Sequence, residues 1–86
     1  MNINNLIIKI REKLNKEIKY ERLNIEDKTF LHKNHVSHET GKFHLKITIK
    51  SNELKKISRI EANKKIFSIL NEYIKKYIHS ISISLL

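Results

Sequence analysis

The stretch FHLKITIK, residues 43–50, decides the fold of this chain. Its hydrophobic side chains alternate with polar ones, so one face of the segment is apolar and the other is polar. The apolar positions are Phe43, Leu45, Ile47 and Ile49. A period of two predicts a β-strand that packs on a core with one face and meets solvent with the other. His44 belongs to the polar set and is therefore expected at the surface.

Two further elements are predicted on the N-terminal side of this strand. Residues 4–18 are typical of an amphipathic helix that Asn4 or Asn5 caps. Its apolar stripe contains Ile7, Ile10, Leu14 and Ile18. Residues 20–27 then change period, because Leu23 and Ile25 alternate with polar residues, and predict a strand.

The C-terminal half predicts two helices and a last strand. A short helix begins near Ser51, and a longer one runs from Ile60 to Tyr77 with Ala62, Ile66, Ile69, Leu70, Tyr73 and Tyr77 on one face. The tail IHSISISLL alternates, and His79 shares the parity of Ile81 and Ile83, so we expect a structural histidine that points toward the core. The predicted order is α-β-β-α-α-β, an α+β domain with three strands covered by helices on one side.

Composition limits the classes of function. With 86 residues, the chain has room for a single domain over residues 1–86. It contains no cysteine, which excludes disulfides and thiolate metal sites. No stretch reads as a membrane span or a signal peptide, so we expect a cytoplasmic protein. Nucleophile elbows, phosphate-binding glycine loops and paired carboxylates are not found either, so catalysis and a small-molecule substrate are not expected.

The net charge of +9 has two explanations, and the sequence leaves both open. It is either an electropositive surface for nucleic acid or an acidic partner, or a consequence of the Lys, Ile and Asn bias of an AT-rich genome. Among the eighteen basic residues fifteen are Lys and three are Arg. Specific contacts to bases and phosphates favour Arg, so this ratio lowers the weight of the first explanation.

Histidines gather in the segment that precedes residues 43–50. His32, His35 and His38 recur at every third position, between the predicted strands. They are either solvated loop side chains or metal ligands. A zinc site built by these three alone is disfavoured, because His-x-x-His spacing suits a helix and no cysteine completes the coordination.

Five sequence words, in order and at matching distances, resemble the BolA family. They are REKL (residues 11–14), LNIED ending at Asp27, HLKITIKS (44–51), IFSIL (66–70) and IHSISI (78–83). They are similar to the family's first helix, LEVxDxS, HFKVxxVS, VYxxL and xHALxL, respectively. The resemblance implies the class II KH-like BolA fold, a three-stranded mixed sheet with helices on one face. A GxxG loop is excluded here, since the chain has a single glycine.

The resemblance also implies partners. BolA-like proteins bind monothiol glutaredoxins and share a [2Fe-2S] cluster with them, so no cofactor intrinsic to this chain is expected. The BolA side is expected to supply a ligand from the loop between the first two strands, here His32, His35 or His38, and a histidine from an RHR word at the start of the third helix. That word reads Ala62, Asn63, Lys64 in this chain, and the neutral amide of Asn63 is a poor iron ligand.

A second function follows from the same family. Some members are stress-linked transcription regulators that contact DNA through a helix-turn-helix, which corresponds to residues 52–77 here. The candidate DNA-binding residues are Lys56, Arg59, Lys64 and Lys65. A third alternative is a homologue that keeps the fold and has lost the cluster role.

Overall fold

The computed structural model describes residues 1–29 and 42–86. In these ranges three strands form one sheet in the order β1 (Arg22–Asp27), β2 (Phe43–Lys50) and β3 (Ile78–Leu85). The pair β1–β2 is antiparallel and the pair β2–β3 is parallel, so the sheet is mixed. The stretch FHLKITIK is a strand, as predicted, and the structure places it at the centre of the sheet.

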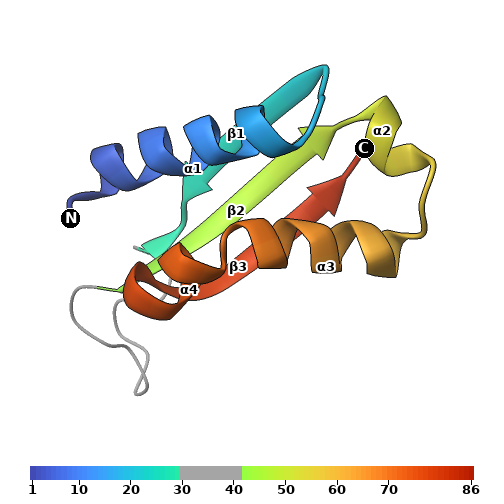
Figure 1. The fold of residues 1–86 in the computed structure, drawn as a ribbon. Coiled ribbons are helices and arrows are strands. Elements are labelled where there is room, and N and C mark those ends of the chain that lie inside the picture. The colour runs from blue at the N-terminus through green and yellow to red at the C-terminus, as the bar shows by residue number, and fades with distance from the viewer. Residues whose placement is uncertain (30–41) are drawn as a thin grey trace.

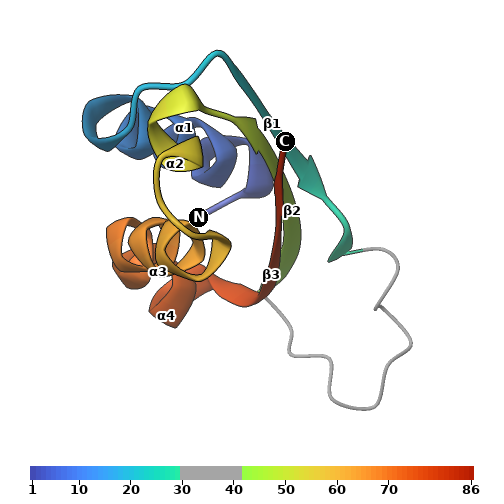
Figure 2. The same cartoon turned by 90° about the vertical axis from the view of Figure 1, so that its right-hand side faces the viewer.

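In the described part of the chain four helices lie against the sheet, and they cover the same face of it (Figures 1 and 2). They are α1 (Ile3–Glu17), α2 (Asn52–Lys55), α3 (Arg59–Ile69) and α4 (Asn71–Tyr77). Parallel strands require a crossover connection, and α2, α3 and α4 form it between β2 and β3. The predicted α+β class is confirmed.

Polar side chains at the helix starts explain where the helices begin. The side chain of Asn2 accepts a hydrogen bond from the Asn5 N–H at 2.8 Å, so the prediction of Asn4 or Asn5 as the cap is wrong. Ser51 caps α2 through the Leu54 N–H at 3.1 Å, and Ser58 caps α3 in the same way through Glu61. Each cap satisfies a backbone donor that has no partner within its helix.

The helix predicted from Ile60 to Tyr77 is divided at Leu70. Leu70 has φ −95° and ψ 7°, outside helical geometry, and is fully buried. Hydrogen bonds continue across the division, from the Leu70 N–H to the Ile66 carbonyl at 3.0 Å and from the Ile74 N–H to the Leu70 carbonyl at 2.9 Å. No proline or glycine marks this position, so packing of Leu70 in the core is the local feature that distinguishes it.

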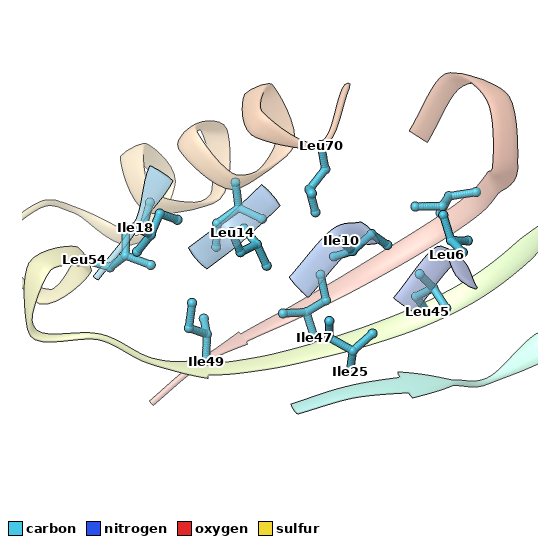
Figure 3. Packing of buried hydrophobic residues seen from close by; sticks show 13 residues of the cluster. Leu6, Ile10, Leu14, Ile18, Ile25, Leu45, Ile47, Ile49, Leu54 and Leu70 are labelled. Atoms are coloured by element: carbon cyan, nitrogen blue, oxygen red, sulfur yellow. The ribbon is translucent and has the colours of Figure 1, made fainter. Parts of the chain in front are cut away.

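The core lies between the central strand and the two long helices (Figure 3). Its fully or almost fully buried members are Leu6, Ile10 and Leu14 of α1, Leu45, Ile47 and Ile49 of β2, and Ala62, Ile66 and Leu70 along α3. Ile7, predicted on the buried stripe of α1, is only partly buried, and Leu6 takes its place. No helix in the described ranges is long and apolar enough to cross a membrane.

Candidate functional site

The end of β1 and the start of β2, which flank residues 30–41, lie side by side at one end of the sheet. Asp27, the last residue of β1, pairs with Leu45 of β2. Asp27 Oδ1 accepts hydrogen bonds from the Thr29 N–H at 3.0 Å and from the Thr29 hydroxyl. Thr29 Oγ1 in turn accepts one from the His44 N–H at 3.2 Å. The predicted ligands His32, His35 and His38 lie outside the described residues, but Thr29, which precedes their segment, is fixed beside His44.

His44 is buried, so its predicted solvent exposure is wrong. Only 6% of the residue is exposed, and its Nδ1 shares a hydrogen bond of 2.6 Å with Ser80 Oγ. Its backbone carbonyl accepts a hydrogen bond from the Lys28 N–H at 2.7 Å. At this end of β2, Ser80 and His79 of β3 lie against the imidazole of His44.

The prediction that His79 points toward the core is also wrong, because His79 is exposed. Phe43 pairs with Ile78, whereas His44 pairs with Ser80, so β3 carries one extra residue, His79, at a bulge. An extra residue reverses the alternation of side chains on one strand. Ile78 is therefore buried before the bulge, and His79 is turned outward. Its ring centroid lies 4.8 Å from that of His44, with the two ring planes at 49°.

A sequence signal for this bulge was present. Ile78 and Ile81 are three residues apart, whereas the following apolar residues of the tail are two apart. We call Thr29, His44, His79 and Ser80 the strand-end cluster. Its two imidazoles differ in access, since one is buried in a hydrogen-bonded position and the other meets solvent. Within the described ranges, no group of three or more His, Asp or Glu side chains could hold a metal ion.

Asn63, which occupies the RHR histidine position, lies elsewhere. It is partly buried on α3 and lines a shallow groove of about 700 Å³. We call this surface the α3 groove, and its residues are Ile60, Asn63, Lys64, Phe67, Ser68 and Asn71. The α3 groove and the strand-end cluster have no residue in common.

The four candidate DNA-binding residues are all exposed, but they do not line one pocket. Lys64 belongs to the α3 groove, whereas Arg59 lines a different pocket of about 330 Å³ between α2 and the end of β3. Lys65 Nζ lies 3.8 Å from Glu53 Oε2 and so forms an ion pair within the protein. Lys56 caps the C-terminal end of α2.

A family model described as BolA-like protein matches residues 14–86. The chain belongs to the BolA-like protein family. This confirms the resemblance that the five sequence words indicated. No curated protein matches the sequence.

Solved structures agree with this assignment. The BolA-like chain is similar to the BolA domain of SufE1 from Arabidopsis thaliana, with a TM-score of 0.77 and 26% identity over 99% of this chain and 92% of that one. It is also similar to BolA1 from Arabidopsis thaliana, with a TM-score of 0.75 and 25% identity over 91% of this chain and 86% of that one. BolA1 from Mus musculus shares the fold at 18% identity and a TM-score of 0.73, covering 92% and 62% of the two chains.

Proposed function

We propose that this BolA-like protein is an adaptor that binds a monothiol glutaredoxin and takes part in iron–sulfur cluster handling or iron-linked stress regulation. The observation that carries the proposal is the exposed imidazole of His79, which lies beside His44 at the end of the sheet where Thr29 leads into residues 30–41. That segment contains three more histidines in sequence. Family membership supports the choice of partner.

The side chains present suit a shared [2Fe-2S] cluster at this end of the sheet. Imidazole replaces thiolate as a ligand in some [2Fe-2S] centres, whereas a neutral amide is a weak ligand for iron bound to sulfide. His79 therefore fits the role that Asn63 does not. In this proposal His79 and one of His32, His35 and His38 hold the cluster from the BolA side, and the glutaredoxin supplies the remaining ligands. The cluster is cargo that the two proteins hold together.

His44 has a positioning role in this proposal. A metal ligand is usually held in orientation by hydrogen bonds and packing from its neighbours. The buried ring of His44, fixed by Ser80, packs against the ring of His79 and restricts where it can lie. The backbone of His44 also holds Lys28 and Thr29, which precede the histidine-rich segment.

The test mixes this protein with a cluster-loaded monothiol glutaredoxin and follows visible absorption. The unmodified protein is expected to change the cluster spectrum, and His79→Ala is expected to abolish the change. Ser82→Ala, at an exposed position of the same strand outside both the strand-end cluster and the α3 groove, is the matched control and should behave as the unmodified protein does. Absence of both a complex and a spectral change with the unmodified protein would refute the function. A spectral change that His79→Ala retains in full would refute the assignment of His79 as a ligand.

A further inference from the structure

The α3 groove displays more apolar surface than the fold requires. Ile60 is 69% exposed and Phe67 is 40% exposed, and both line the groove. The opposite side of α3 already supplies the core through Ala62 and Ile66. Large hydrophobic side chains that are gathered in one hollow, rather than scattered, mark interaction sites on soluble proteins.

The charge of the groove selects the type of occupant. Among the described residues, Lys64 is the only charged one that lines it, and the other polar lining residues are Asn63, Ser68 and Asn71. No carboxylate of residues 1–29 or 42–86 lines the groove, and the whole chain carries a net charge of +9. A second copy of this chain would bring the same excess of positive charge and be repelled, whereas an acidic protein would be attracted. Nucleic acid is disfavoured as the occupant, because phosphates are bound by cations and hydrogen-bond donors, whereas the described lining of the groove includes the large apolar side chains of Ile60 and Phe67 beside Lys64.

We propose that the α3 groove docks an acidic segment of the glutaredoxin, with an apolar side chain between Ile60 and Phe67 and a carboxylate at Lys64. The inference rests on the proposed function for the identity of the partner. It adds that docking does not require the cluster, since Asn63 in the groove is a poor iron ligand and the strand-end cluster is a separate site. From Ile60 to Ser68 the groove follows roughly 12 Å of α3, which is the length of a two-turn helix or a short extended segment.

The experiment measures the Kd of this protein for cluster-free monothiol glutaredoxin by calorimetry. Ile60→Ser and Phe67→Ser are each expected to raise Kd by about tenfold or more, since central apolar anchors carry most of the energy of an interface. Ile8→Ser is the matched control, because Ile8 is 52% exposed on α1 and does not line the groove. It should leave Kd unchanged. All three positions are exposed, and circular dichroism verifies that each variant is folded.

Charge is tested with a second pair of variants. Lys64→Glu is expected to raise Kd more than Lys16→Glu, which changes the net charge equally but lies exposed on α1. Equal effects of the two variants would mean that only net charge matters and would overturn the docking site.

The outcomes separate this inference from the proposed function. If Ile60→Ser and Phe67→Ser behave like Ile8→Ser while cluster-loaded glutaredoxin still changes its spectrum, the docking site is wrong and the function stands. If neither cluster-free nor cluster-loaded glutaredoxin binds, both the docking site and the proposed function are wrong. Two further results would overturn the inference by assigning the groove to another occupant. One is a dimer of this protein, seen in sedimentation, that Ile60→Ser dissociates. The other is binding of duplex DNA that Phe67→Ser weakens and Ile8→Ser does not.

Discussion

At the scale of single residues, His44 and His79 differ from their predicted solvent exposure at a place where β3 carries one extra residue. Alternation along each strand placed His44 outside and His79 inside, and the structure has the reverse. The bulge at His79 changes the parity of β3, and the neighbouring residues of β3 then cover His44. Of the two imidazoles in the described part of the chain at this end of the sheet, the accessible one is therefore the one that the pattern assigns to the core.

The hydrogen bond between His44 and Ser80 predicts a difference between two serines of β3. Ser80→Ala removes the partner of a buried imidazole nitrogen and should lower the free energy of unfolding by about 1–3 kcal/mol. Urea denaturation followed by circular dichroism measures this value. Ser82→Ala, at an exposed position of the same strand, is the control and should change it by less than about 0.5 kcal/mol. Equal changes would show that the hydrogen bond contributes no stability.

At the scale of elements, α3 serves two surfaces. Ala62 and Ile66 bury one side against the core, while Ile60 and Phe67 leave the other side apolar and exposed. This weakens the helical periodicity that identifies a surface helix. Packing on one side and capping by Ser58 hold the helix in place, so the orientation of the α3 groove depends on both.

The cap of α3 is predicted to be worth about 1 kcal/mol. Ser58→Ala removes the acceptor of the Glu61 N–H, at 3.1 Å, and should lower the free energy of unfolding by about 0.5–2 kcal/mol. Thermal and chemical unfolding measure the loss. Ser68→Ala is the matched control, because Ser68 is exposed within the same helix and alanine has the higher helix propensity. A variant at Ser58 as stable as the Ser68 variant would contradict the capping role.

At the scale of the whole molecule, one strand organises the core and one sign of charge dominates the surface. Ile47 lies at the centre of β2, paired with Ile25 on one side and Ile83 on the other, and is fully buried. A domain of this size buries a smaller share of its surface than a large one, so each core residue matters more.

Truncation of this central residue should be severe. Ile47→Ala is expected to lower the free energy of unfolding by about 2–5 kcal/mol, through lost burial and the cavity that it leaves. Denaturant unfolding provides the measurement, with Ile8→Ala as the exposed control of the same chemistry. The expected loss is a large part of the total stability of a small domain, which is only about 5–15 kcal/mol. A loss below about 1 kcal/mol would mean that the core repacks around the gap.

The charge of +9 predicts DNA association that depends on salt rather than on sequence. Contacts to phosphates alone lose affinity uniformly as salt rises, by roughly 10³-fold or more between 50 and 200 mM for six contacts. Fluorescence anisotropy with several unrelated duplexes measures this dependence. Lys56→Gln should weaken binding more than Lys65→Gln, because Lys65 is already paired with Glu53. One duplex that keeps its affinity at high salt would instead favour a helix-turn-helix regulator over residues 52–77.

The sequence by itself determined the class of fold, the strand over residues 43–50 and the family. These depend on local periodicity and on short words, which are properties of neighbouring residues, and FHLKITIK carries both. The mixed sheet was implied by the family resemblance, and the pairing of β2 with both neighbours confirms it.

Only the tertiary structure decided which side chains are accessible. The division of the last helix at Leu70, the burial of His44, the exposure of His79 and the groove beside Asn63 all depend on contacts between segments far apart in the chain. His44 and Ser80, for example, are 36 residues apart and share one hydrogen bond. Periodicity assigns a face to a side chain, but a bulge in a neighbouring strand and the residues that pack on that face decide whether the side chain meets solvent.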